Sequence, residues 1–174
     1  MGQRKASAIF MPSKYVFPGG AVDPGDAAPI AFLSPTCARR LALLCGSNDP
    51  GPHALTGAAR RELAEETGLD LQPTARLRFI FRAITPPGRS RRFDARFFLA
   101  QSTDLAGDPD DFTSACDELS DLHWIGLAAA RGLDLPFITE VVLSEVTALL
   151  SGQDQAGVPF FDNSESTPVF RRLT

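Results

Sequence analysis

The sequence predicts one domain of the α+β or α/β class. Helical and extended patterns alternate along the chain, but without the regular βαβ spacing of a doubly wound sheet. The chain has 174 residues, of which 44% are hydrophobic and 22% charged, and this is enough apolar material for one core. We therefore expect residues 1–174 to fold as a single sandwich of helices and sheet.

Composition and charge argue against several classes of partner. The formal net charge of −4 is unlike that of a dedicated nucleic-acid-binding domain, which is normally basic. No apolar run approaches the roughly 18 residues needed to cross a bilayer. Three cysteines cannot all pair within one chain, which favours a reducing compartment. The sequence thus predicts a cytoplasmic protein with neither nucleic acid nor membrane as its partner.

A short strand and a short helix are predicted before residue 50. The strand covers Lys14 to Phe17 and ends at paired glycines. Residues 24–53 are rich in proline and glycine, and within them only residues 36–45 could form a helix. That helix would bury Leu41 and Leu44.

A longer helix is predicted over residues 55–66. This segment is rich in Ala, Arg, Leu and Glu, which all favour helix formation. Thr56 is a candidate N-cap, and Gly68 lies where a glycine commonly ends a helix.

Two strands are predicted after this helix. In residues 76–84 the odd positions are apolar and arginines occupy most even positions, which is the pattern of a half-buried strand. A basic loop over residues 85–92 leads to a second, more apolar strand at 93–100. Residues 101–114 form an acidic loop.

The last third of the chain is predicted to hold a strand, a helix and a docked tail. The strand covers residues 122–125, and the helix begins near Pro136. The apolar segment 158–161 is expected to dock on the body of the domain. One face of the helix is expected to bury Ile138, Val142, Val146 and Leu149.

Three glutamates share one face of the longer helix. Glu62, Glu65 and Glu66 are spaced i, i+3 and i+4, which places their side chains within an arc of about 100°. Carboxylates this close repel one another unless a cation neutralises them, and such hard oxygen ligands suit Mg²⁺ or Mn²⁺ better than zinc. A diphosphate is the substrate class that such ions serve. The alternative is a solvated acidic helix face, but Arg61 directly before the cluster and Gly68-Leu69 directly after it favour the metal site.

Around this cluster the sequence resembles the Nudix (MutT-like) hydrolases. Residues 61–69 match the second half of the family's box, R-E-apolar-x-E-E-x-G-apolar, at every specified position. Gly20 and Asp26 resemble its first half, with Asp in place of the family's Glu. Family spacing would put the arginine at position 34, so the box carries an insertion of 61 − 34 = 27 residues, at about 27–53. Such interrupted boxes are similar to those of the subgroup that includes peroxisomal coenzyme A diphosphatases.

The resemblance implies an α/β/α sandwich with a mixed sheet, and it assigns roles to residues of the box. Glu65 and Glu66 would be the principal metal ligands, and Glu62 would bind through water or accept a proton. The Gly19 carbonyl would complete the metal shell, and Arg61 would hold a carboxylate in place by a bidentate pair. The structural positions of the box would be Gly20, Asp26 and Gly68.

Two loops contribute further candidates. A distal glutamate assists the base in several family members, and Glu118 is the nearest candidate here, with Asp117 the second. Solvated loop carboxylates are an equal alternative for both. Arg89, Arg91 and Arg92 could contact substrate phosphates, with a solvent-exposed loop as the alternative.

The start of the chain leads to another expectation. Family members normally have a long strand before the Pro-Gly-Gly loop, often ending in an arginine, and Gln3-Arg4 occupies that ending here. We expect that the chain begins inside the fold and lacks this strand. A sheet edge exposed in this way would favour a homodimer.

Taken together, these features predict an Mg²⁺-dependent pyrophosphohydrolase that cleaves a nucleoside diphosphate linked to another moiety. The interrupted box suggests a coenzyme A-like or dinucleotide substrate. The alternative is a catalytically silent Nudix scaffold that binds a nucleotide ligand or a protein partner. The three box glutamates favour the enzyme, whereas Asp26 and the missing strand keep the alternative open.

Overall fold

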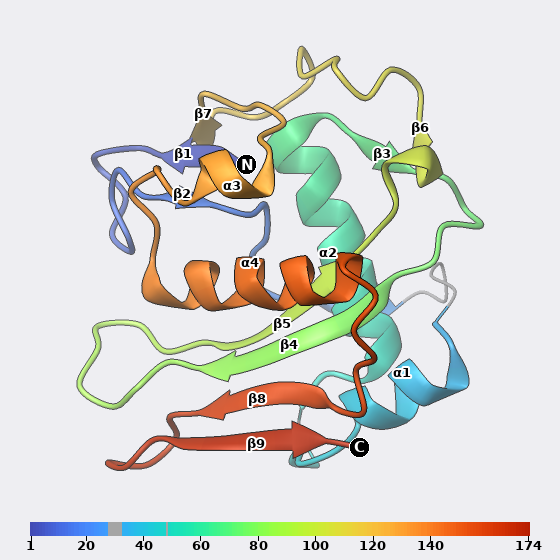
Figure 1. Cartoon of the computed structure of the whole chain (residues 1–174). Coiled ribbons are helices and arrows are strands. Elements are labelled where there is room, and N and C mark those ends of the chain that lie inside the picture. The colour runs from blue at the N-terminus through green and yellow to red at the C-terminus, as the bar shows by residue number, and fades with distance from the viewer. Residues whose placement is uncertain (28–32, 48) are drawn as a thin grey trace.

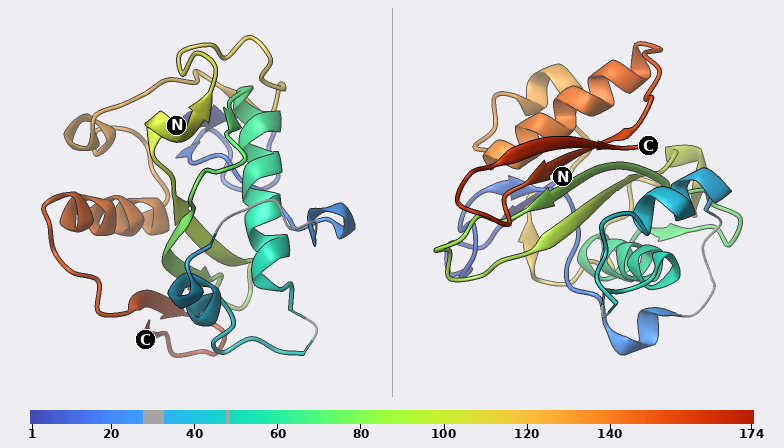
Figure 2. Two further views of the ribbon diagram at one scale, coloured as in Figure 1. Left: turned by 90° about the vertical axis from the view of Figure 1, so that its right-hand side faces the viewer. Right: turned by 90° about the horizontal axis from the view of Figure 1, so that it is seen from below.

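The computed structural model describes residues 1–27, 33–47 and 49–174, and its elements form three layers (Figure 1). The middle layer is a four-stranded sheet in the order β5-β4-β8-β9. The outer layers are helical (Figure 2): α1 (Pro35–Leu41) and α2 (Pro52–Thr67) on one face, and α3 (Leu127–Ala130) and α4 (Phe137–Leu150) on the other. The predicted α/β/α sandwich is therefore confirmed.

The four-stranded sheet is mixed, as predicted. Its strands are β4 (Arg78–Ile84), β5 (Asp94–Leu99), β8 (Val158–Asp162) and β9 (Val169–Leu173). β4 pairs antiparallel with β5 and parallel with β8, and β8 pairs antiparallel with β9. A smaller sheet has the order β2-β1-β7 and consists of β2 (Tyr15–Val16), β1 (Gly2–Arg4) and β7 (Leu119–Ser120). Strand β3 (Asp70–Leu71) pairs with β6 (Leu105–Ala106). Two 3₁₀ segments are η1 (Pro24–Ala27) and η2 (Ser102–Asp104).

The first strand lies inside its sheet. β1 pairs with β2 on one side and with β7 on the other, and the amino group of Met1 donates to the carbonyl of His123 at 2.9 Å. Neither side of β1 is therefore a free edge. The missing upstream strand and the homodimer stay predictions.

A β-bulge divides the apolar side chains of β4 between the two faces of the sheet. The pairing with β5 shifts register between Phe79 and Phe81. Phe79 consequently packs in the core beside α1, whereas Ile80 and Phe81 pack in the core beside α4. The prediction of a half-buried strand is wrong, because helices cover both faces and a bulge breaks the period of two.

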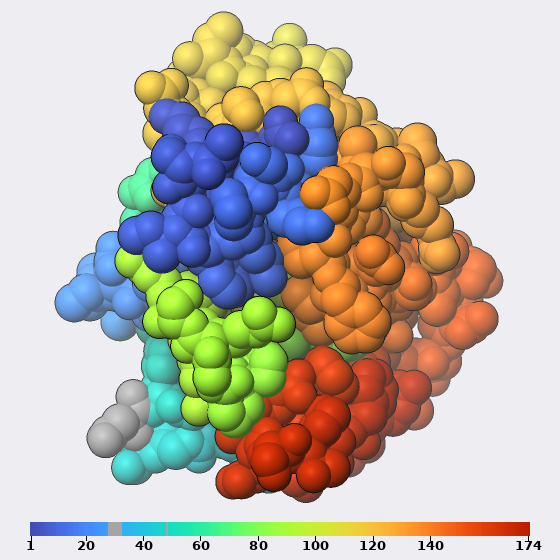
Figure 3. Space-filling view, turned by 90° about the vertical axis from the view of Figure 1, so that its left-hand side faces the viewer, coloured from blue at the N-terminus to red at the C-terminus, as the bar shows by residue number. Residues whose placement is uncertain are grey.

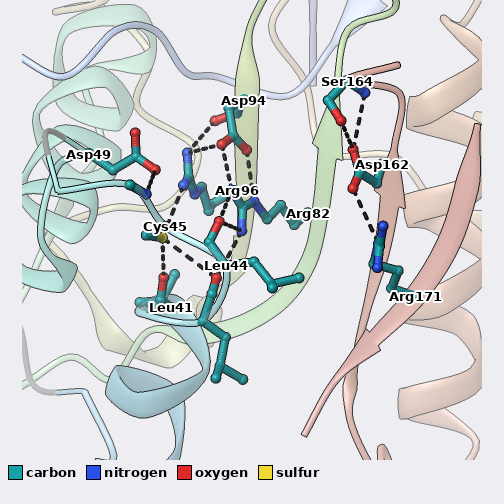
Figure 4. A network of polar contacts seen from close by, with 12 residues as sticks. Leu41, Leu44, Cys45, Asp49, Arg82, Asp94, Arg96, Asp162, Ser164 and Arg171 are labelled. Carbon is teal, nitrogen blue, oxygen red and sulfur yellow. Dashed lines mark hydrogen bonds and ion pairs between the residues drawn. The ribbon is translucent and has the colours of Figure 1, made fainter. Parts of the chain in front are cut away.

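Arg82 is the clearest departure from the predicted polar face. Its side chain is only 3% exposed, and its Nε and Nη2 donate to Asp94 at 2.9 and 2.7 Å. Its Nη1 and Nη2 also reach the carbonyl of Leu44, and Arg96 approaches the same aspartate and the thiol of Cys45 (Figure 4). Residues of the insertion therefore cover this face, and buried arginines satisfy their backbone carbonyls.

The described part of the insertion belongs to the core. Leu41 on α1 is 2% exposed and packs with Leu55 and Phe160, among others. Leu44, which was expected to be buried too, is 60% exposed. The helix ends at Leu41 and the chain turns through a positive φ of 53° at Leu44, so that side chain leaves the helical face. Residues 28–32 and 48 of the predicted insertion lie outside the described residues.

Helix α2 is longer than predicted. It begins at Pro52 after the N-cap Gly51, and it ends at Gly68, whose φ of 75° is left-handed as expected. The predicted N-cap Thr56 instead lies inside the helix, where its hydroxyl donates to the carbonyls of Pro52 and His53 at 3.0 Å. Proline at the first helical position gives an earlier start, because its missing N–H has no partner to lose there.

The end of the chain contributes more to the sheet than predicted. Residues 158–161 are part of the inner strand β8, and β9, like α3, was not predicted. The strand expected at 122–125 is absent from those residues, and β7 occupies Leu119–Ser120 instead. Helix α4 begins at Phe137 as expected, with Val142 buried and its other predicted core residues partly buried. None of the helices described here is long and apolar enough to cross a membrane.

Leu41 and Leu44 provide a direct test of this packing. Leu41→Ala is expected to lower the free energy of unfolding by about 2–5 kcal/mol, because it leaves a cavity in the core. Leu44→Ala is expected to change it by less than about 0.5 kcal/mol, because that side chain is exposed. Urea denaturation followed by circular dichroism measures both values, and equal losses would contradict the assignment of α1 to the core.

Candidate active site

One arginine connects the two halves of the interrupted box. Arg61 on α2 donates from Nε to Asp26 Oδ1 at 2.9 Å and from Nη2 to Asp26 Oδ2 at 3.1 Å. Its Nη2 also donates to the carbonyl of Ala21 at 2.8 Å. The pair is bidentate, the geometry in which guanidinium and carboxylate bind most strongly. Residues on either side of the insertion are thereby joined.

The shorter aspartate reaches Arg61 because η1 lies very close to α2. A Cβ added to Gly57 would come within 2.1 Å of the carbonyl oxygen of Asp26, so only glycine fits at this contact. The backbone of η1 therefore lies directly against the helix, within reach of Arg61 for the short side chain of Asp26. Sequence reasoning had not singled out Gly57, which looks like any glycine inside a helix.

Asp26 is held as an ionised carboxylate. The residue is 7% exposed, and the hydrogen bond from Arg61 holds its pKa below the usual range. The backbone N–H of Asp23 donates to Oδ2 at 2.7 Å and acts in the same direction. The pKa of Arg61 is raised, with its bond to Asp26 as the main cause. This pair is charged throughout the physiological range.

The same guanidinium also binds two of the three glutamates. Arg61 Nη1 donates to Glu62 Oε1 and to Glu65 Oε2, both at 2.9 Å. The Glu62 side chain is 13% exposed, whereas that of Glu65 is 54% exposed. Burial raises the pKa of Glu62 despite its contact with Arg61. Glu65 is thus the more accessible carboxylate, and an exposed ion pair of its kind is easily exchanged.

Glu66 is the buried carboxylate of the cluster. The residue is 2% exposed, and its Oε2 accepts a hydrogen bond from the backbone N–H of Gly19 at 2.7 Å. Burial raises its pKa to about 7, and the nearby charges of Glu118 and Glu62 add to this effect. One backbone N–H therefore compensates too little of the charge on Glu66.

The close approach of Glu62 explains why position 20 of the box is a glycine. A Cβ on Gly20 would lie 2.2 Å from Glu62 Oε1 and 2.7 Å from its Oε2. The Gly19-Gly20 loop therefore passes directly under the carboxylate of Glu62 and donates to Glu66. A side chain at position 20 would push the Glu62 carboxylate out of the cluster.

The loop before β7 places Glu118 near this cluster. Arg4 Nη2 contacts Glu118 Oε1 at 3.4 Å, and the charge of Glu118 raises the pKa of both Glu62 and Glu66. Asp117 is fully exposed and has only a 3.9 Å contact with a lysine. Glu118 is thus the better placed of the two predicted carboxylates. Arg4, which also lowers the pKa of Glu66, received no role from the sequence, although it ends the first strand.

The three arginines of the β4–β5 hairpin show no contact with this cluster. Arg92 donates to the carbonyls of Thr85 and Ser164, the second in the turn between β8 and β9. Arg89 and Arg91 are exposed. In the space-filling view the green tip of the hairpin lies between the blue N-terminal segment and the red β8–β9 turn (Figure 3). Their contact with substrate phosphates stays a prediction.

The donor atoms of the cluster fit a hard divalent cation. Within the described ranges, no three His, Cys, Asp or Glu side chains are already arranged as a metal centre. Arg61 lies between Glu62 and Glu65, and Gly19 holds Glu66. All of the side-chain donors are carboxylates, and the raised pKa of Glu66 indicates a shortage of positive charge.

Comparisons with known proteins agree with this geometry. The family model described as the NUDIX domain matches residues 31–144. The crystal structure of a NUDIX hydrolase from Alicyclobacillus acidocaldarius superimposes with a TM-score of 0.50 and 25% sequence identity, over 82% of this chain and 80% of that chain. A search of curated proteins gave no match.

Gly57→Ala tests the close approach of η1 to α2. In an unhindered helix this change would stabilise the protein by about 1 kcal/mol. Here it is expected to lower the free energy of unfolding by about 1–3 kcal/mol, because the added methyl group overlaps the carbonyl of Asp26. Chemical denaturation measures the change. A variant more stable than the wild type would show that the contact is looser than described.

Asp26→Asn tests the ion pair through its pH dependence. Near pH 7 the variant is expected to lose about 1–3 kcal/mol of unfolding free energy, because Arg61 keeps a weaker partner. The folded-state pKa of Asp26 is lowered, so its contribution is complete above the unfolded pKa of about 3.9 and disappears as the pH falls through the folded value. The difference from wild type should therefore shrink below about pH 4.

Asp23→Asn is the matched control for this change. Its carboxylate lies 3.8 Å from Arg61 and is 65% exposed, so we expect a change of less than about 0.5 kcal/mol. Denaturation curves between pH 3 and 7 measure both variants. A difference for Asp26→Asn that stays constant over this range would contradict the ion pair.

Proposed function

The chain belongs to the Nudix family and is a hydrolase of P–O–P bonds in nucleoside diphosphate derivatives, and we propose that its activity depends on Mg²⁺ or Mn²⁺. We further propose that its substrate is coenzyme A-like or a dinucleotide. The observation that carries this proposal is the cluster of Glu62, Glu65 and Glu66 beside the Gly19-Gly20 loop, joined by Arg61 to Asp26. All box carboxylates are present and close together despite the insertion.

The proposed cation would be held by Glu65 and Glu66, with Glu62 binding through water or accepting a proton and the Gly19 carbonyl completing the shell. When bound, such a cation offsets the charge of a diphosphate and lowers the pKa of a water molecule. The buried carboxylate of Glu66 supports this assignment, because a cation would replace the proton that its raised pKa otherwise retains near neutral pH.

The protein groups supply positioning and proton transfer. Water attacks one phosphorus of the diphosphate, a new P–O bond forms, and the bond from that phosphorus to the bridging oxygen breaks. The second phosphate leaves with the bridging oxygen, so each product keeps one phosphate of the former diphosphate. A carboxylate accepts the proton of the attacking water, and Glu62 or Glu118 lies in the right region for this role. Arg61 keeps Glu62 and Asp26 in place throughout.

The substrate subclass rests on the interrupted box. The described residues 33–47 of the insertion pack on the sheet through α1, and none of them lines the cavity that adjoins Glu118. A bulky second moiety could therefore occupy this side of the glutamates.

We propose a single domain over residues 1–174 with an insertion at about 27–53.

We also propose a cytoplasmic location. The described residues include the free thiols of Cys37, Cys45 and Cys116. Free thiols of this kind are typical of a reducing compartment. The proposed partners are small nucleoside diphosphate derivatives, and the net charge of −4 argues against nucleic acid as a partner.

Turnover of a mixed substrate panel tests the proposed function. The panel contains coenzyme A and its acyl derivatives, NADH, ADP-ribose, diadenosine polyphosphates, nucleotide sugars and nucleoside triphosphates, with products identified by mass spectrometry. We expect Mg²⁺-dependent cleavage of coenzyme A-like or dinucleotide substrates into two products, each of which keeps one phosphate of the broken diphosphate. The combined change Glu65→Gln and Glu66→Gln should lower kcat/KM at least about 100-fold, because the cation loses its principal ligands.

Glu165→Gln is the matched control, since this glutamate is exposed in the turn between β8 and β9. It should leave turnover unchanged. Cleavage that survives loss of Glu65 and Glu66 would contradict the assigned cluster. Absence of any turnover by the wild type would favour the silent scaffold that binds a nucleotide or a protein.

A further inference from the structure

A cavity adjoins the glutamate cluster and lies outside the box. It is a shallow hollow that is largely open to solvent, and the space within it is about 450 Å³. Arg4, Lys5, Ser7 and Ala8 form one wall, and Cys116 to Glu118 form the other. In the space-filling view the blue N-terminal segment lies against the yellow surface of the loop before β7 (Figure 3).

The cavity is fixed to the catalytic end of α2. The backbone N–H of Cys116 donates to the carbonyl of Glu65 at 2.8 Å. Gly68 packs so closely on Ser114 and Ala115 that an added Cβ would lie 3.1 Å from both. The wall that carries Glu118 is therefore held at a constant position relative to the box glutamates.

Two cations face this cavity with weak partners. Arg4 Nη2 lies 3.4 Å from Glu118, whose side chain is 52% exposed. Lys5 Nζ lies 3.9 Å from Asp117, which is fully exposed. Arg4 Nε is buried and has no hydrogen-bond partner within the described part of the chain. Long, exposed ion pairs contribute little, so both cations can exchange a carboxylate for a better anion.

A phosphate group is the anion that suits these cations best. A guanidinium binds two phosphate oxygens at once, and an ammonium adds a point charge beside it. Arg4 contacts Glu118, and the same wall is joined to the helix of the box glutamates by the hydrogen bond from Cys116 to Glu65, so the guanidinium lies on the side of the cavity that is tied to the glutamates. A ligand held by Arg4 would therefore extend from the reacting diphosphate into the cavity.

We propose that Arg4 and Lys5 bind a phosphate group of the substrate in this cavity and thereby determine which nucleoside diphosphate derivatives the enzyme accepts. The inference rests on the proposed function and extends it beyond the box. The phosphate is either part of the diphosphate that is cleaved or a phosphomonoester elsewhere in the substrate. Both sources offer the same dianionic oxygens to the two cations.

Two substrates that differ by one phosphomonoester distinguish these sources. Steady-state kinetics are measured with coenzyme A and with 3′-dephospho-coenzyme A for the wild type, Arg4→Gln and Lys5→Gln. If the phosphomonoester is bound, the wild type prefers coenzyme A, and Arg4→Gln abolishes the preference through a KM raised about tenfold or more. If the diphosphate is bound, both substrates lose at least about tenfold in kcat/KM. Either result supports the cavity as a phosphate site.

Arg76→Gln is the matched control, because Arg76 is exposed just before β4 and carries the same charge. Equal kinetics for this control and for the Arg4 and Lys5 variants with both substrates would overturn the inference. Arg4→Lys should recover part of the loss, since it keeps the charge without the bidentate fork. Lys5 is exposed, so Lys5→Gln decides the question if Arg4→Gln does not fold.

A binding measurement separates failure of this inference from failure of the proposed function. Adenosine 3′,5′-bisphosphate is titrated into metal-free protein by calorimetry, without any turnover. A dissociation constant raised about tenfold by Arg4→Gln, but unchanged by Arg76→Gln, supports the cavity even if neither coenzyme is cleaved. Absence of binding to the wild type, or equal binding by all variants, overturns it.

Discussion

The guanidinium of Arg61 connects three parts of the site through four residues. It binds Asp26 across the insertion, the carbonyl of Ala21 in the glycine loop, and the carboxylates of Glu62 and Glu65 on its own helix. Three glutamates within one turn of helix would otherwise repel one another and the nearby aspartate. Because a guanidinium has donors on three sides, one side chain can hold the loop, η1 and α2 in a fixed arrangement.

Close backbone contact is the second condition for this arrangement. Gly57 allows η1 to approach α2, and Gly20 allows the preceding loop to pass under Glu62. With these two contacts in place, the residues just before the insertion are fixed near Arg61, while helix α1 of the insertion packs into the core through Leu41. An insertion inside the box is therefore compatible with a complete carboxylate cluster, because its described helix packs on the sheet.

The local features of the sequence were predictable, and the long-range ones were not. The glutamate face of α2 and the left-handed Gly68 follow from spacing along a single helix. The burial of Arg82 depends on a bulge in β4 and on an insertion that covers the strand. Neither can be read from the alternation of apolar and polar residues along the strand. Arg4 reaches Glu118 across the chain, and β9 completes the sheet from the far end of the sequence. Such contacts are set by tertiary packing, which a single sequence does not display.

The carboxylates of the site divide into two classes because one arginine cannot neutralise all of them. Asp26 accepts hydrogen bonds from Nε and Nη2 of the guanidinium, and its pKa is lowered, so it stays ionised as a structural anchor. Glu66 receives a backbone N–H and faces other carboxylates, and its pKa rises to about 7. Positive charge is therefore concentrated at Asp26, where the two halves of the box are joined, and is in deficit around Glu66. That deficit is the physical basis of the proposed cation site, and under the same proposal a phosphate bound beside it would depend on Arg4 for its own compensation.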